Sequence, residues 1–237
     1  DAEEVLRLLA EVLERIIELI KKVNEILIRV LREVIRLIEE VNELVREVLK
    51  RIIELIRRDI DDEDVRRLVE RIKTVAEELH KEVRKLVKEI EDLARKSNED
   101  VRKLVKDIRR VVEELKRANL RKDRLAEAVE DLLRRILEAI KRHLRKAEEI
   151  IKRILEAIRE HLKKLRELAK EIKDAARKAG VDERILEEIE RLVREVEEIH
   201  ERVLRRLKEL LKKVREVHEE VLRRIERLAE RVREALK

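Results

Sequence analysis

The chain has no proline, cysteine, methionine, phenylalanine, tryptophan or tyrosine, and it has a single glycine in 237 residues. A chain of this length and average composition would hold roughly 12 prolines and 16 glycines. Because proline and glycine interrupt helices and form turns, their scarcity predicts long uninterrupted helices. The absence of cysteine excludes disulfides, thiolate chemistry and cysteine-based zinc sites.

What remains is mostly charged and aliphatic. Charged residues make up 51% of the chain, a composition typical of coiled coils and long helices. The 64 basic and 58 acidic residues give a net charge of +6 and alternate in sign, as in the stretch from Glu14 to Lys22. Without a basic stripe we expect no nucleic-acid binding. No apolar run approaches the length of a membrane span, and no aromatic anchors favour a membrane surface, so we expect no membrane contact.

Three short segments carry the helix-ending signals. Gly180 suits the left-handed position after a helix, Val181 can supply the apolar contact that follows, and Asp182 can cap the next helix. Residues 59–64 combine poor helix formers with good N-caps, and Asn119 is a second candidate for the left-handed conformation. The predicted helices therefore span about residues 2–58, 62–118, 121–179 and 183–236.

Apolar positions follow an 18-residue repeat in all four predicted helices, as from Val5 to Val23. One such repeat makes five turns of an α-helix, so it keeps one face apolar without the supercoil that a seven-residue repeat imposes. The repeat continues through Ser97 and Asn98, which argues against a break there. We predict an all-α fold, an antiparallel up-down-up-down bundle of four long, nearly straight helices, forming a single domain over residues 1–237.

Polar residues on the apolar faces follow the same step and include all five histidines. In an antiparallel hairpin, residues equally far from the turn lie at the same height, and this rule sorts them into two layers. Ser97 is included because it shares the phase of Leu79. The Asn42 layer consists of Asn42, His80, His161 and His200. The Asn24 layer consists of Asn24, Ser97, Asn98, His143 and His218.

Asn and His side chains each offer a donor and an acceptor, so such a layer can satisfy its own hydrogen bonds. Together with the 18-residue repeat and the aromatic-free composition, these layers make the whole chain resemble de novo designed helical bundles with buried hydrogen-bond networks. The resemblance implies a structural scaffold or self-assembling bundle in which polar layers give register and pairing specificity. It implies no enzymatic activity, no catalytic residue, no cofactor and no small-molecule substrate.

Other uses of the histidines remain open. His80, His161 and His200 could present three imidazoles to a metal ion, although the sequence shows no HxxxH pair and no carboxylate placed beside them. Buried neutral histidines could also make the protein responsive to pH, because burial lowers their pKa. Nucleophilic catalysis is not expected, because Ser97 is the only serine and no carboxylate is placed to orient a histidine beside it.

The first predicted helix has the widest apolar arc, about 200° against about 140° for the second and fourth, at 100° per residue. The extra flank consists of Leu6, Leu13, Ile17, Ile28, Leu31, Ile35, Leu49 and Ile53. Soluble monomers rarely expose an apolar stripe of this length, so we expect a homo-oligomer that buries the flank. The alternatives are a monomer that tucks this helix between its own neighbours and a separate helical partner lying along it.

Overall fold

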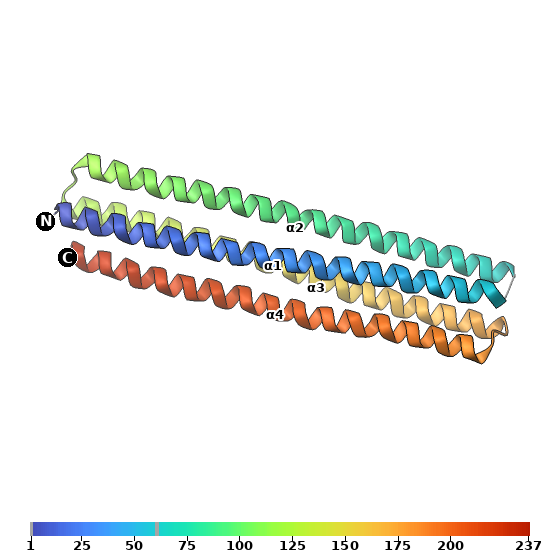
Figure 1. The fold of residues 1–237 in the computed structure, drawn as a ribbon. Helices are drawn as coiled ribbons and strands as arrows, with labels where there is room; N and C mark the ends of the chain where they lie inside the picture. Colours follow the sequence, from blue (N-terminus) through green and yellow to red (C-terminus); the bar gives the residue numbers. More distant parts are fainter. Residues whose placement is uncertain (1, 60–61) are drawn as a thin grey trace. The chain divides into compact units, whose positions relative to one another are not determined.

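The computed structural model describes residues 2–59 and 62–237, and in those residues it contains α-helices and no strand. The helices are α1 (Ala2–Asp59), α2 (Glu63–Ala118), α3 (Lys122–Lys178) and α4 (Glu183–Leu236) (Figure 1). Each end agrees with the prediction from the sequence to within one residue, and the all-α fold class is confirmed. Ile60 and Asp61 of the first predicted turn lie outside the described residues.

The turn between α3 and α4 takes the predicted left-handed conformation at Gly180, whose φ is 75°. The amide of Gly180 donates to the carbonyl of Arg177 and that of Val181 to the carbonyl of Ala176, each at 3.1 Å. These are the paired hydrogen bonds of a Schellman motif. Val181 also packs with Ala176 and Leu186 in a small buried cluster. The turn therefore satisfies two terminal carbonyls of α3 and buries the apolar residue that follows the glycine.

Three further predictions are confirmed in the described residues. Asn119, between α2 and α3, has a φ of 50°, as predicted for a left-handed position. The carboxylate of Asp182 accepts a 3.4 Å hydrogen bond from the amide of Arg184, which makes it a weak N-cap of α4. Ser97 and Asn98 lie inside an unbroken α2, as the apolar phase predicted.

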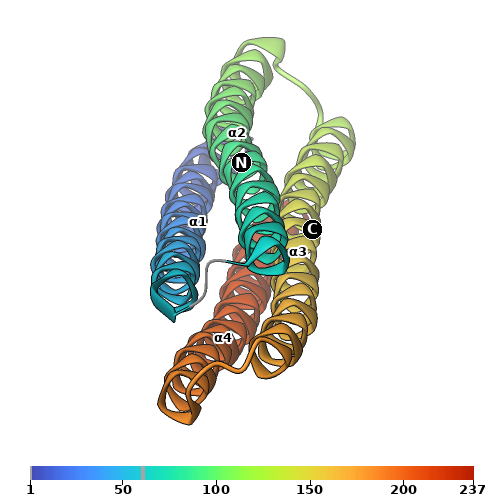
Figure 2. The same cartoon turned by 90° about the vertical axis from the view of Figure 1, so that its right-hand side faces the viewer.

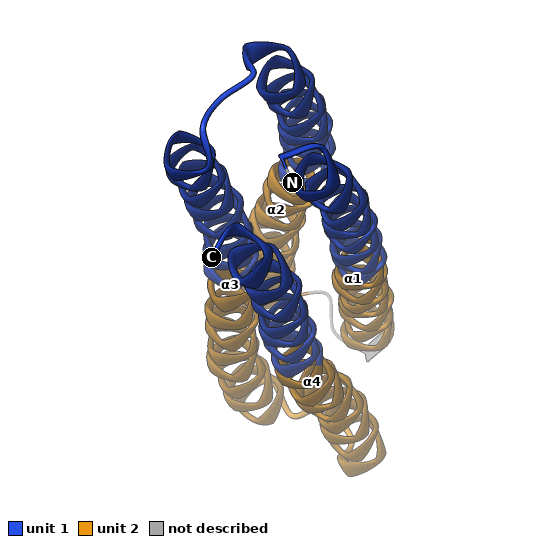
Figure 3. Ribbon diagram, turned by 90° about the vertical axis from the view of Figure 1, so that its left-hand side faces the viewer, with its two compact units in different colours: residues 1–31, 91–150, 210–237 blue, residues 32–90, 151–209 orange. Residues whose placement is uncertain are grey.

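The chain divides into two compact units, coloured separately in Figure 3. Unit 1 comprises residues 1–31, 91–150 and 210–237, and unit 2 comprises residues 32–90 and 151–209. Every helix contributes one segment to each unit. That residues 1–237 form a single domain stays a prediction.

In unit 1 the segments of all four helices enclose an aliphatic core. Ile16, Ile108, Ile136 and Ile225, one from each helix, are fully buried in one cluster. Because each segment is polar on its outer face, the apolar stripes can leave water only by packing against one another. The core is built without aromatic side chains, so branched aliphatic residues fill it.

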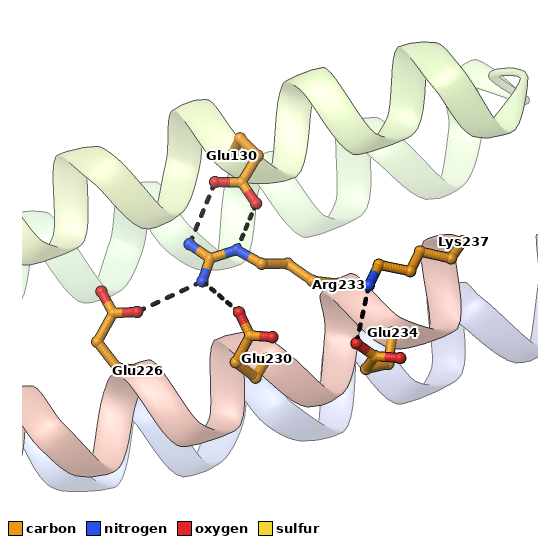
Figure 4. A network of polar contacts seen from close by, with 6 residues as sticks. All are labelled: Glu130, Glu226, Glu230, Arg233, Glu234 and Lys237. Carbon is orange, nitrogen blue, oxygen red and sulfur yellow. Dashed lines mark hydrogen bonds and ion pairs between the residues drawn. The ribbon is translucent and has the colours of Figure 1, made fainter.

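Charged pairs join neighbouring helices at the surface of unit 1. Figure 4 shows Arg233 of α4 reaching across to Glu130 of α3 with two guanidinium nitrogens, while Glu226 and Glu230 of α4 bind the third. The hydrogen bond to Glu130 is the main cause of the raised pKa of Arg233. Exposed pairs of this kind contribute little each, typically about 0–1 kcal/mol.

Unit 2 repeats the arrangement. Its core contains the fully buried Ile38, Ile72, Ile158 and Ile189, again one from each helix. In Figure 2 the near ends of the helices belong to this unit, and α1 and α3 lie on opposite sides, each beside α2 and α4. Ion pairs at 2.8 Å join α1 to α4 through Glu33 and Arg206, and α2 to α3 through Glu89 and Arg153.

The wide apolar flank of α1 is buried by the chain itself. Leu13, Ile17 and Leu31 are at most 1% exposed, Leu49 is buried, and the remaining members of the flank are half-buried. No large hydrophobic side chain is exposed in the part of the chain that the structure describes. The premise of the predicted homo-oligomer, an apolar stripe open to solvent, is therefore wrong.

The width of the flank follows from the number of helices that α1 contacts. In unit 1, α1 and α3 bury adjacent residues, such as Val12 with Leu13 and Leu132 with Leu133. In that unit α2 instead buries every third or fourth residue, namely Val105, Ile108, Val112 and Leu115. Adjacent helical residues point about 100° apart, so burying both requires neighbours on a wider arc. The polar contact between α1 and α3 described below shows that these two helices also meet directly.

We expect Gly180→Ala to lower the free energy of unfolding by about 1–2 kcal/mol, because an L-residue is strained in the left-handed conformation even where there is room for its Cβ. Chemical denaturation followed by circular dichroism measures the change. Gly180→Asn is the matched control and should cost less, because asparagine tolerates this conformation. Equal stability of the alanine variant and the parent would contradict the argument.

Candidate functional site: the two buried polar layers

The Asn24 layer lies within unit 1, and hydrogen bonds connect all five of its side chains. Asn24 Nδ2 lies 2.7 Å from Asn98 Oδ1. Ser97 Oγ lies 2.7 Å from both Asn24 Oδ1 and His143 Nε2, and His143 Nδ1 lies 2.8 Å from His218 Nε2. Since Asn24 is on α1, the Ser97–Asn98 pair on α2, His143 on α3 and His218 on α4, the network joins all four helices.

The proton positions in this network can be deduced from its end at α4. His218 Nδ1 lies 2.8 Å from the backbone carbonyl of Val214, which can only accept, so Nδ1 carries a proton. In a neutral ring, Nε2 of His218 is then an acceptor and takes the Nδ1 proton of His143. Neutral His143 is left with an acceptor at Nε2. The hydroxyl of Ser97 must therefore donate to His143.

Ser97 has only one hydroxyl proton, so it cannot also donate to Asn24 Oδ1, which lies 3.1 Å from His143 Nε2 as well. With neutral rings this amide oxygen would face two acceptors. Turning the amides of Asn24 and Asn98 by half a turn removes the conflict, because Asn24 Nδ2 then donates to Ser97. In the opposite orientation, Asn24 Nδ2 faces Asn98 and Asn24 Oδ1 faces His143. This orientation suits a His143 that is protonated at both nitrogens. The amide orientation is therefore coupled to the charge of His143.

Burial favours the neutral rings. It lowers the pKa of His143 to about 4, and the neighbouring His218 and Lys146 act in the same direction. Burial also lowers the pKa of His218, against the opposing effects of the Val214 carbonyl and Glu148. At neutral pH both rings are therefore uncharged, and the one-way order of donors from Asn98 to Val214 applies.

The Asn42 layer lies within unit 2 and does not form one network. Asn42 Nδ2 lies 2.9 Å from His80 Nδ1, which joins α1 to α2. His161 Nε2 instead lies 3.0 Å from a carboxylate oxygen of Glu82. His200 Nδ1 lies 2.8 Å from the carbonyl of Val196, one turn earlier in its own helix. The four residues predicted to share a layer are thus divided among three separate hydrogen-bonded groups.

Glu82 corrects the prediction that no carboxylate stands beside these histidines. It is half-buried on α2 and also lies 3.9 Å from Lys164. Burial is the largest influence on His161 and lowers its pKa, while the Glu82 carboxylate opposes that effect. The sequence held a signal for this contact: Glu82 and Lys164 each lie one repeat from a member of the Asp100–Lys146 pair, whose separation is 3.7 Å.

His200 is fully buried, and its Nε2 has no hydrogen-bond partner among the described residues. An unsatisfied buried polar atom costs about 1–3 kcal/mol. Burial lowers the pKa of His200, which the Val196 carbonyl opposes and His161 reinforces. In the Asn24 layer the corresponding nitrogen, His218 Nε2, is bonded to His143.

The two layers differ at two neighbouring positions of α2, where Ser97 and Asn98 correspond to Leu79 and His80. Ser97 bridges Asn24 and His143, whereas one repeat earlier α2 has Leu79, a buried side chain that cannot form hydrogen bonds. Without the bridge, the α1–α2 pair of the Asn42 layer is not connected to α3, and His161 binds Glu82 instead.

The site has little catalytic potential. Ser97 and His143 have the spacing of a nucleophile and its base, with His218 orienting the base. A base whose pKa is about 4 is weak at neutral pH, however. Ser97 also lies inside α2, where backbone amides are bonded to helix carbonyls and cannot serve as oxyanion donors.

The metal alternative gains no support either. Within residues 2–59 and 62–237, no three His, Asp or Glu side chains lie close enough together to hold a metal ion. In the Asn42 layer, His80, His161 and His200 each face a different partner instead of a common centre.

The chain matches no family model, and neither the curated proteins nor the solved structures searched contain a significant match to it. Among the residues that the structure describes, no helix combines the length and the apolar character needed to cross a membrane.

We expect the protein to lose stability as the pH falls from about 6.5 to about 4. His143 is neutral when folded but gains a proton near pH 6.5 when unfolded, so acid favours the unfolded state. The loss attributable to His143 is about 3 kcal/mol over this range. Urea denaturation at several pH values measures it, with His143→Gln as the reference. Parallel pH profiles of the two proteins would contradict the assignment.

We expect Glu82→Gln to lower the pKa of His161 further, because the carboxylate is the group that opposes the effect of burial. The titration of the His161 ring by NMR measures the shift, and the absence of other aromatic residues leaves the five histidine signals free of overlap with other rings. Glu78→Gln, one turn earlier on α2, should leave the titration unchanged. If the pKa of His161 is the same in the Glu82 variant as in the parent, the proposed coupling between the two side chains is wrong.

Proposed function

We propose that this chain is a designed structural scaffold, and that its buried polar layers select one register of the four helices. The observation that carries the proposal is the Asn24 layer, in which one connected network takes a side chain from every helix. The 18-residue repeat and the aliphatic composition support a designed origin, because strict repetition and side chains with few rotamers suit deliberate packing.

The apolar repeat alone would leave the register ambiguous. A helix moved by one whole repeat would again present apolar residues at apolar positions. The same movement would place Leu79 where Ser97 now binds Asn24 and His143. Each buried polar group left without a partner costs about 1–3 kcal/mol, so several such losses disfavour the shifted arrangement. The two layers differ in composition, and this difference is what makes the correct register unique.

We propose further that the scaffold is a monomer. The apolar flank of α1 that suggested a homo-oligomer is covered by the other helices of the same chain, and Asn24 and Asn42 bind α2 instead of copies of themselves. A partner helix along α1 loses its basis for the same reason. The mixed surface charge supports neither nucleic-acid binding nor an enzymatic role, so the proposal includes neither.

Replacing the whole Asn24 layer with leucine tests the role in register. We expect the variant to resist denaturant better than the parent, since apolar residues avoid the cost of burying polar groups, but to populate several states. The parent should give one set of amide NMR signals and a mass of 28.7 kDa by light scattering. The variant should give additional signals or larger species.

One control variant and two possible outcomes make the test decisive. A variant with leucine at five exposed positions of the same helices tests whether added apolar surface alone causes association. If the layer variant keeps one set of signals and the parent's mass, the layer is not needed for register. If the parent itself has a mass that is a multiple of 28.7 kDa, the monomer proposal is wrong and self-assembly through another surface must be sought.

A further inference from the structure

A cavity of about 290 Å³ lies in unit 1 next to the Asn24 layer. Its inner wall is formed by Ile20, Val23 and Leu27 of α1, which are almost completely buried. Its outer residues belong to α2 and α3 and are largely exposed, so the cavity opens between those two helices. The volume is near the lower end of the range for small-molecule sites, roughly 300–1,000 Å³.

The cavity exists partly because Ser97 stands where the repeat elsewhere has leucine. Ser97 lines it, and the positions one repeat away on either side of Ser97 are Leu79 and Leu115, both buried. Ala139 of α3 lines it as well and adds little volume. The hydroxyl that completes the network therefore leaves space in the core beside it.

The mouth of the cavity is positively charged. Lys96 and Lys103 of α2 and Arg142 and Lys146 of α3 line it, against a single acidic residue, Asp100. Asp100 lies 3.7 Å from Lys146 and offsets only that charge. A bound anion at the mouth would thus meet an excess of cations, while a bound cation would be repelled.

The polar groups at the inner end are already engaged. Ser97 and His143 line the cavity, but they bind each other at 2.7 Å and continue the network to Asn24 and His218. An apolar group can pack beside them without taking their partners. An ionised group would do better at the mouth, where water and the basic side chains solvate it.

We propose that unit 1 binds a small carboxylate with an apolar body, in which the hydrocarbon fills the cavity against α1 and the carboxylate lies among the basic residues at its mouth. Octanoate has the required chemistry: one negative charge at the end of a short, flexible chain. A ligand of this size in a partly open site should bind with a Kd on the order of 1 mM or below.

NMR titration of the full chain with octanoate at neutral pH tests the proposal. The five histidine rings are the only aromatic groups in the protein, so their signals can be followed individually. We expect the His143 signals to shift to saturation, while those of His161 and His200 in unit 2 stay in place. Isothermal titration calorimetry gives the Kd independently. Uniform small shifts of all five rings without saturation would overturn the proposal.

Ala139→Leu should fill the cavity and weaken octanoate binding at least ten-fold, because Ala139 lines the cavity without belonging to the polar network. Ala157→Leu is the matched control, since it makes the same change at the same phase of α3, one repeat later and in unit 2. Denaturation curves identify any loss of folding. Equal binding by the two variants would show that octanoate binds elsewhere.

The charge requirement is tested separately, with variants that leave the core intact. Lys103→Gln combined with Arg142→Gln should weaken octanoate binding roughly three- to ten-fold, in proportion to two exposed ionic contacts. Lys85→Gln combined with Arg124→Gln, each one repeat earlier in the same helix, should have no effect. The neutral analogue 1-octanol should bind more weakly than octanoate. Its Kd should be the same in the parent and in both double variants. Tighter binding of 1-octanol would overturn the assignment of a carboxylate.

Discussion

Ser97 has one hydroxyl proton and two acceptors within reach, and the arrangement of the Asn24 layer follows from where that proton goes. Because the carbonyl of Val214 only accepts, His218 donates to it from Nδ1 and accepts at Nε2. His143 therefore donates to His218 from Nδ1 and accepts the hydroxyl proton of Ser97 at Nε2. Inside an aliphatic core, each such choice has a large energetic consequence because an unpaired group finds no alternative partner among its neighbours. The network therefore admits few arrangements, and those it admits differ in charge.

The Asn42 layer is built on the same helices but has no hydroxyl group at the position that corresponds to Ser97. With Leu79 in place of the serine, the pair on α1 and α2 is isolated and His161 binds Glu82 at the edge of the core. His200 keeps its bond to the preceding turn but leaves Nε2 unsatisfied. Ser97 thus connects α2 to both α1 and α3 in the Asn24 layer, and it also lines the cavity in unit 1.

The breadth of each apolar stripe reflects position in the cross-section of a unit. α1 and α3 meet directly in unit 1, through Asn24 and His143, in addition to packing against α2 and α4. Both helices bury adjacent residues there, as α4 also does at Leu210 and Leu211. In the sequence, a stripe wider than a simple bundle requires suggests self-association. In the structure the other helices of the same chain cover the wide stripe of α1.

The four helices, the left-handed turn residues and the candidates for the polar layers could be predicted from the sequence alone. Periodicity along a single helix and the special conformations of Gly180 and Asn119 are local properties, so they could be predicted without knowing what packs against what. The partner of His161, the unpaired Nε2 of His200 and the burial of the α1 flank were decided by the tertiary structure. These features depend on which helices contact one another and on the lengths of side chains at the edge of the core, such as that of Glu82. Heights along a helix can be counted in a sequence, whereas distances across the core arise only when all four helices pack.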